Sequence, residues 1–157
     1  MKRQKYTVGS IVEIPINNGE YYCYGQLIGY GECAVFDFRA SRPITDFSIL
    51  DDTRMLFRVC LYRHVIGSGE WLKVGKLPLR EEFKTFPDQF IYHDWNQRFF
   101  LYKVESGEII PASKEECRGL ERSAVWDSNH VEDRILAHYN NTLCVWQEEE
   151  IRIFADD

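Results

Sequence analysis

The sequence feature that most constrains the fold is an alternation of residues that leads directly into a tight turn. Val12, Ile14 and Ile16 are separated by Glu13 and Pro15, which gives the two-residue period of a β-strand. The tripeptide 17–19 is Asn-Asn-Gly, and such residues adopt the left-handed backbone that closes a hairpin. We therefore predict two antiparallel strands joined by this turn.

The strand-like pattern continues through the first two-thirds of the chain. Aromatic residues make up 15% of the sequence, which favours sheets with half-buried aromatic faces. Further strands are predicted at Glu20–Tyr30, Cys33–Arg39, Met55–Ile66, Trp71–Val74, Gln89–Trp95, Arg98–Glu105 and Glu108–Ile110. We expect Gly67-Ser68-Gly69 to turn the long strand back into Trp71–Val74 as a second hairpin.

The pattern changes in the C-terminal third. Ser113 and Glu116 form a capping box, and Cys117, Leu120 and Ala124 follow at helical spacing. Asn129 with Glu132 repeats the capping arrangement, ahead of an apolar face that ends at Asn140-Asn141. Strand character returns at Thr142–Gln147 and Ile151–Phe154, which Glu148-Glu149-Glu150 separates as a turn.

Together these patterns predict a mostly β (α+β) fold. We expect a curved antiparallel sheet or a partly open barrel, with two short helices in the C-terminal third. A chain of 157 residues is the size of one ordinary domain, so we assign residues 1–157 to a single domain.

Charge and cysteine content exclude several classes of protein. The net charge is −6 and the acidic residues are concentrated in the second half, which disfavours direct binding to nucleic acid or to an anionic membrane. Glu13 and Pro15 interrupt any apolar leader, and the five cysteines contain no CxxC pair. We expect a cytoplasmic protein with reduced cysteines.

The usual signatures of catalysis and of cofactor binding are missing. The sequence contains neither a Gly-rich phosphate-binding loop nor a GxSxG nucleophile motif. Asp127 and His130 have a ligand-like spacing, but two ligands do not hold a metal ion. Cys117 lies near a predicted helix N-terminus, yet it occupies an apolar position. We therefore expect no enzyme activity, no cofactor and no metal.

An acidic cluster is the first candidate for a binding surface. It consists of Glu148, Glu149, Glu150, Asp156 and Asp157, and it would attract a basic protein partner.

A second, weaker candidate patch is Trp126, Asp127 and His130. Trp126, Trp95 and Trp146 are expected to be exposed and could anchor a protein contact, because tryptophan is frequent at interface hot spots.

A series of short segments, taken in order, resembles a known family. The segments are Gly9–Ile16, Tyr22–Gln26, Ser68–Trp71, Val74-Gly75, Glu116–Glu121, Val125–Asp127 and His130–Arg134. Together they resemble the immunity protein 26 family of bacterial polymorphic toxin systems, from Gly9 to about Tyr139. The acidic cluster lies outside this likeness.

The resemblance implies a mostly β protein, encoded beside a toxin, that protects the producing cell by binding that toxin. It brings neither catalytic residues nor toxin-contact residues. We therefore expect stoichiometric occlusion of a cognate toxin, for which a nuclease with a basic cleft is one fitting class. Both candidate patches are assigned to toxin binding.

Two alternatives stay open at the level of the sequence. Tyr21, Tyr22, Tyr24 and Tyr30 would suit a non-catalytic β module that binds a small ligand or a peptide, if their rings lined one pocket. A hydrolase built on Cys117 or Cys144 with a histidine would require a lowered thiol pKa.

Overall fold

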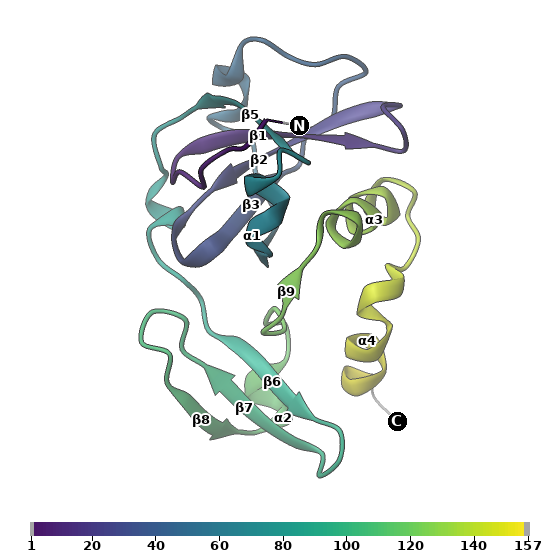
Figure 1. Cartoon of the computed structure of the whole chain (residues 1–157). Coiled ribbons are helices and arrows are strands. Elements are labelled where there is room, and N and C mark those ends of the chain that lie inside the picture. The colour runs from purple at the N-terminus through teal and green to yellow at the C-terminus, as the bar shows by residue number, and fades with distance from the viewer. Residues whose placement is uncertain (1, 156–157) are drawn as a thin grey trace.

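The computed structural model describes residues 2–155 and contains two β-sheets with short helices beside them (Figure 1). The first sheet consists of β1 (Ser10–Ile16), β2 (Tyr21–Leu27), β3 (Glu32–Phe36), β4 (Met55–Leu61), β5 (Leu72–Lys76) and β9 (Val125–Trp126). The second consists of β6 (Gln89–His93), β7 (Arg98–Tyr102) and β8 (Ile109–Ala112). The helices are α1 (Arg63–Gly67), α2 (Lys114–Cys117), α3 (Ser128–Tyr139) and α4 (Glu148–Phe154). The 3-10 turns are η1 (Gly29–Gly31), η2 (Phe47–Leu50), η3 (Glu81–Phe83) and η4 (Val145–Gln147).

The predicted fold class is confirmed, with 32% of the residues in strands and 27% in helical conformations. The first sheet has the order β5-β1-β2-β3-β4-β9 and is not closed into a barrel. All its pairs are antiparallel except that of β9 with β4, which is parallel. The sheet is therefore mixed, because β9 arrives from the second sheet and pairs with β4 in the same direction.

The first hairpin forms as the sequence predicts. Asn17, Asn18 and Gly19 all have positive φ, and Ile16 lies opposite Tyr21 in the ladder. The left-handed backbone thus places the turn immediately after the alternating strand. The second strand ends at Leu27, because the η1 turn follows.

The first sheet is buried on both faces. One face packs Val12, Ile14 and Ile16 against Trp71 and against α3. The other face holds a second cluster that includes Tyr24, Phe36, Leu50 and Phe83, with the η2 and η3 segments covering it. Helix α3 presents Val131 and Ile135 to the first face, as its predicted apolar spacing requires.

The prediction of one long strand over Met55–Ile66 is wrong for the second half of that range. β4 ends at Leu61, and Arg63–Gly67 forms α1, whose Val65 and Ile66 are buried. The predicted hairpin is wrong as well, because β5 pairs with β1 and not with β4. A short run of apolar residues is compatible with a buried helix as well as with a strand. The spacing of apolar residues alone therefore does not distinguish the two structures here.

The C-terminal strands predicted at Thr142–Gln147 and Ile151–Phe154 are also wrong. These stretches contain η4 and α4, and Glu148-Glu149-Glu150 is the first turn of α4 and not a loop between strands. Carboxylates at a helix N-terminus are stabilised by the helix dipole, which explains the position of the triplet.

The start predicted for the first helix is confirmed, whereas its predicted length and the cap predicted for the second helix are wrong. The Ser113 and Glu116 capping box is present, but α2 ends at Cys117, and Gly119 with φ of 84° leads the chain away. Helix α3 is capped by Asp127 and not by Asn129.

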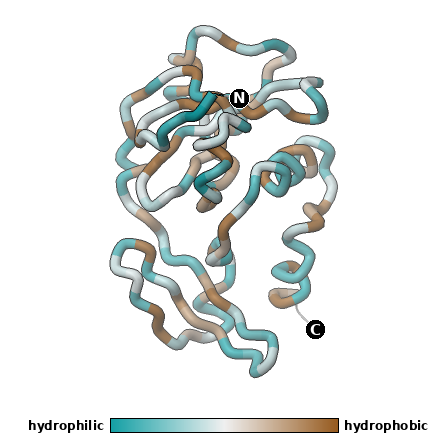
Figure 2. The backbone as a smooth tube through the Cα atoms, viewed as in Figure 1, coloured by the Kyte–Doolittle hydropathy of each residue, from teal (hydrophilic) through white to brown (hydrophobic). Residues whose placement is uncertain are grey.

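Within residues 2–155, no helix combines the length and the apolar character needed to cross a bilayer. Figure 2 shows hydrophobic and hydrophilic residues following one another at short intervals along the tube.

Candidate functional site

One residue of the acidic cluster, Glu150, and two of the second patch, Trp126 and His130, line the same cleft. This cleft has a volume of about 480 Å³, and Trp126, His130, Trp146 and Glu150 are among its lining residues. Its walls come from β9, the start of α3, η4 and α4, with Phe90 of β6 contributing from the second sheet. Figure 1 shows α4 running from α3 toward the second sheet, which brings these elements together.

The aromatic residues of this cleft differ in exposure. Trp146 is 45% exposed, and its Nε1 donates a hydrogen bond to Asp133 Oδ2 at 2.9 Å. The His130 and Trp146 ring centroids are 4.0 Å apart. Trp126 is only 8% exposed and belongs to the core, so the expectation that it is exposed is wrong.

The third tryptophan, Trp95, is exposed as expected but lies elsewhere. It occupies the turn between β6 and β7, where it stacks on His93.

The acidic triplet carries less free charge than its sequence suggests. Arg122 Nη1 lies 3.2 Å from Glu149 Oε2 and 3.3 Å from Glu150 Oε1. Two of the three carboxylates therefore hold α4 against the body of the protein, while Glu148 is exposed. Asp156 and Asp157 lie outside the described residues.

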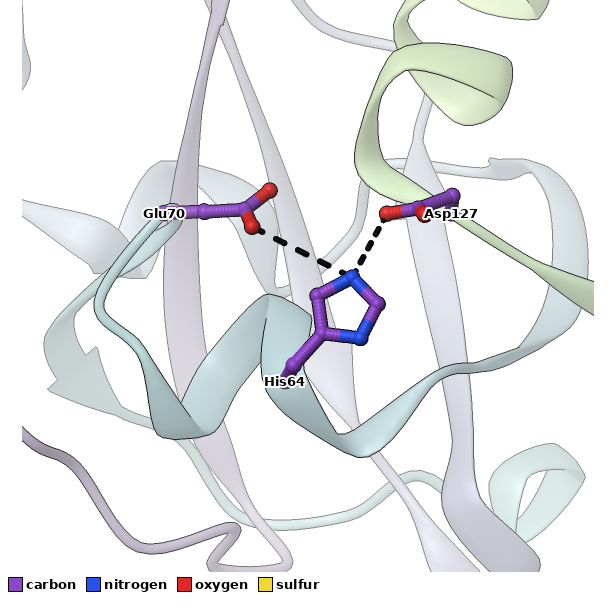
Figure 3. A group of neighbouring side chains, drawn as sticks. All are labelled: His64, Glu70 and Asp127. Carbon is purple, nitrogen blue, oxygen red and sulfur yellow. Dashed lines mark hydrogen bonds and ion pairs between the residues drawn. The ribbon is translucent and has the colours of Figure 1, made fainter.

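A second group of polar side chains lies at the junction of α1 and α3 (Figure 3). His64 Nε2 is 2.9 Å from Asp127 Oδ1 and 3.9 Å from Glu70 Oε1. Ser128 donates from its backbone N to Asp127 Oδ1 and from its Oγ to Glu70 Oε2. The Ser128 N–H and then His64 hold the pKa of the Asp127 carboxyl below its usual range.

Glu132 adjoins this group and is half-buried. Its Oε2 accepts a hydrogen bond of 2.9 Å from Trp71 Nε1. Burial raises the pKa of the Glu132 carboxyl, and the charges of Asp133, Glu70 and Asp127 raise it further. Four carboxylates, those of Asp127, Glu132, Asp133 and the nearby Glu70, therefore lie around the N-terminal half of α3.

We expect Glu132→Gln to change how stability depends on pH. A carboxyl whose folded pKa is raised contributes stability below its unfolded pKa, and this contribution is lost as pH rises through the folded pKa. The difference in unfolding free energy should therefore move in favour of the glutamine variant as pH rises from about 4. Urea unfolding of both proteins across this range measures the difference.

The same urea unfolding series, repeated at high salt, separates the causes of the raised Glu132 pKa. Salt screens the charges of Asp133, Glu70 and Asp127 but leaves the burial of Glu132 unchanged. Since burial is the largest cause of the raised Glu132 pKa, most of the pH-dependent change in the stability difference should persist at high salt. A difference that stays constant with pH, or that moves in favour of the wild type, would contradict the prediction.

The cysteines do not have the property that a nucleophile needs. Cys23, Cys33, Cys60, Cys117 and Cys144 are all free thiols. Burial raises the pKa of every one of them, to about 12 for Cys23 and Cys33. Cys117 is fully buried, as its apolar position predicts. The hydrolase alternative required a lowered thiol pKa, so the structure speaks against it.

The tyrosines of the ligand-binding alternative do not share a pocket. Tyr21 packs edge-on against Tyr139 on one face of the first sheet, with ring centroids 5.8 Å apart. Tyr24 is buried on the opposite face, where its hydroxyl bonds to Glu13 and to the N–H of Ile44. Tyr30 is 56% exposed on η1. Tyr22 packs against the cluster that contains Tyr24, so only these two of the four rings lie in the same cluster.

Sequence reasoning missed His64, Glu70 and Arg122 as members of these groups. The signal that could have identified Glu70 is its segment, Ser68–Trp71, which already carried the resemblance to a family. In the structure Glu70 contacts Ser128, and Trp71 contacts Glu132. Two of the segments that carry the family resemblance, Ser68–Trp71 and His130–Arg134, are therefore in contact in the structure.

Comparison with known proteins gives one family. The family model described as immunity protein 26 matches residues 7–101, a range that runs from the approach to β1 into β7. It includes His64, Glu70 and Trp71, whereas α3 and α4 lie beyond it. No curated protein and no solved structure matches the chain.

Proposed function

The chain belongs to the immunity protein 26 family, and from this membership we propose that it neutralises a cognate toxin by binding it and covering its working surface. The family match over residues 7–101 is the observation that carries this proposal. In the proposal the protein acts stoichiometrically and catalyses no reaction.

We place the toxin contact on the exposed side of α3, η4 and α4. Asp133 and Glu148 are exposed there, and Trp146 lies between them in sequence and is held by Asp133. A half-exposed tryptophan flanked by carboxylates combines an apolar anchor with long-range attraction for a basic surface. His130 extends this surface into the cleft.

The other candidate residues then have supporting roles. Glu149 and Glu150 hold α4 through Arg122, and Trp126 supports the cleft from the core. Asp127 fixes the start of α3.

The protein as a whole has enough surface for a stable complex. A standard interface buries about 800 Å² on each partner. This is less than a tenth of the 9249 Å² accessible surface of the protein. A nuclease with a basic cleft is one toxin class that such an acidic face would complement.

We further propose that residues 1–157 act as one domain. β9 pairs with β4 of the first sheet, and the adjacent Ser123 N donates to Phe90 O of the second sheet at 2.8 Å. Phe154 of α4 packs edge-on against Phe90, with ring centroids 5.0 Å apart. These contacts join both sheets to the C-terminal helix.

The proposal is tested with the toxin domain encoded next to the gene for this chain. We expect the purified domain to form a one-to-one complex with this protein, and cells that produce both to survive. Failure of the two proteins to associate, together with no protection of the cells, would contradict the proposed function.

Charge reversal tests the proposed face. Glu148→Lys should slow association with the toxin domain by roughly 10-fold at low salt, because steering depends on exposed charge. The matched control is Glu108→Lys, which reverses an exposed charge in the turn before β8. Stopped-flow or surface binding kinetics at two salt concentrations measure the rates.

The two variants should differ at low salt and converge with the wild type at high salt. Equal association rates for Glu148→Lys and Glu108→Lys at low salt would remove α4 from the proposed interface.

A further inference from the structure

We propose that His64, Glu70 and Asp127 form a binding site for a divalent transition-metal ion, with Zn²⁺ the best match. The proposal is independent of toxin binding, because it concerns this chain alone. Its basis is the convergence of one imidazole nitrogen from α1, one carboxylate oxygen from the turn after α1 and one from the N-cap of α3 (Figure 3).

The donor atoms have nearly the spacing of a zinc coordination sphere. One potential ligand atom from each of His64, Glu70 and Asp127 lies within 4.8 Å of those of the other two residues. Bonds of about 2.0–2.2 Å to Zn²⁺ place neighbouring donors about 3–3.5 Å apart. The Nε2 to Oδ1 distance of 2.9 Å already fits, while the distance of 3.9 Å to Glu70 needs only a small rotation of an exposed side chain.

Neighbouring groups orient each donor. The Ser128 hydroxyl binds Glu70 Oε2 and leaves Oε1 directed at the imidazole. The Ser128 N–H fixes the Asp127 carboxylate. The Tyr62 ring stacks on His64 with an interplanar angle of 22°. Metal sites depend on such outer contacts, because they hold the ligands in position before the ion arrives.

The local charge favours a cation. In the part of the chain that the structure describes, His64 is the partner in every ion pair that Glu70 and Asp127 make. Glu132 and Asp133 add two more carboxylates on the same turn of α3, and they bind the Trp71 and Trp146 indoles. Carboxylates therefore outnumber basic side chains around this group, and a divalent ion would offset their negative charge.

The donor types determine which ion fits. An imidazole with two carboxylates suits Zn²⁺ and its neighbours in the transition series, whereas Mg²⁺ and Ca²⁺ prefer oxygen ligands alone. The side chains of His64, Glu70 and Asp127 are 50%, 35% and 34% exposed. A fourth position therefore faces solvent, where water or a donor from another molecule completes the coordination.

The test is calorimetric titration of the metal-free full-length protein with Zn²⁺ in a buffer containing excess Mg²⁺. We expect one Zn²⁺ ion per chain. The variants His64→Ala, Glu70→Gln and Asp127→Asn each remove one ligand, and asparagine retains the ability to cap α3. Ser128→Ala, which removes an outer contact, should weaken binding by about 10- to 100-fold, and each ligand variant by at least as much.

The matched control is His138→Ala. His138 also faces a carboxylate, with its Nε2 4.0 Å from Asp37 Oδ1, but it is not part of the three-donor group. Zinc affinity should be unchanged in this variant. Circular dichroism of every variant confirms that it is folded, so a loss of affinity reports on the site.

Cobalt substitution identifies the donor atoms. Co²⁺ at the proposed site should give visible bands without a sulfur-to-cobalt charge-transfer band, because all three donors are nitrogen or oxygen. The proposal is overturned by absence of zinc uptake, by wild-type affinity in His64→Ala, or by a sulfur band that places the ion on a cysteine.

Discussion

Replacing Trp71 with alanine lowers the free energy of unfolding by about 3–5 kcal/mol, the range for removing a large aromatic side chain from a core. Trp71 is 1% exposed and packs in the cluster between the first sheet and α3. Its indole N–H is also the hydrogen-bond donor to Glu132. The variant therefore loses packing and leaves a half-buried carboxylate without its partner. Urea unfolding followed by circular dichroism measures the loss.

Two further variants show which property of Trp71 matters. Trp95→Ala removes the same side chain from a position that is 77% exposed, and its effect should stay within about 0.5 kcal/mol. Trp71→Phe keeps most of the ring but removes the donor, so it should cost about 1–3 kcal/mol. Similar losses for Trp71→Ala and Trp95→Ala would show that the cluster does not hold the fold together.

The second large effect concerns the buried ion pair of Arg58 and Glu32. Arg58→Met lowers the free energy of unfolding by about 3–5 kcal/mol, because it leaves Glu32 buried without a cation. The two side chains are 9% and 4% exposed, and Arg58 Nε is 3.2 Å from Glu32 Oε1. Arg58 also donates to the carbonyls of Glu82 and Thr85, so it ties the segment between the two sheets to β4.

The control for this prediction is a second ion pair, between Arg54 and Asp37, which is more exposed. Arg54→Met breaks the ion pair with Asp37, in which Arg54 is 79% exposed, and it should cost only about 0–1 kcal/mol. The double variant Glu32→Gln with Arg58→Met should lose less than the sum of the single changes, since the unpaired charge is gone. Strict additivity would contradict the proposed role of the pair.

The Arg58→Met loss should also depend on pH. Burial raises the pKa of the Glu32 carboxyl, and the nearby Arg58 charge opposes that rise. Without Arg58 the folded pKa rises further, so the variant retains most stability where Glu32 is protonated in both states. Its deficit relative to the wild type should therefore grow as pH rises from about 4 toward neutrality.

The parts of the fold that the sequence predicts are those set by local chemistry. The first hairpin follows from the left-handed preference of Asn17, Asn18 and Gly19, and the α2 start follows from a capping box. The apolar face of α3 follows from the spacing of Val131 and Ile135. In each case the determining residues lie within a few positions of one another.

The parts that the sequence does not predict depend on distant contacts. The segment 151–154 is rich in isoleucine and phenylalanine and would suit a strand, but in α4 Phe154 packs on Phe90 and Phe99 of the second sheet. Arg122 anchors the same helix through the acidic triplet. Tertiary packing therefore overrides the local preference for strand.

The candidate sites show the same limit. The cleft joins residues that the sequence had placed in two patches, because Trp146 of η4 packs on His130 at the start of α3 and α4 continues along the cleft. His64 and Asp127 are 63 positions apart and meet only because β9 pairs with β4 just before α3 begins. Spacing within a single element could reveal the pair of Asp127 and His130, but it could not reveal His64 or Glu70.

The short strand β9 has a consequence for how the protein behaves at high concentration. β9 covers the outer edge of β4 with only two residues, and the opposite edge strand β5 carries Lys73 and Lys76. A brief strand at one margin and lysines at the other both hinder the addition of a strand from another molecule. The β5 margin and the end of β4 that β9 covers are thus protected against the addition of a strand from another molecule, even though the interior of the sheet is apolar on both sides.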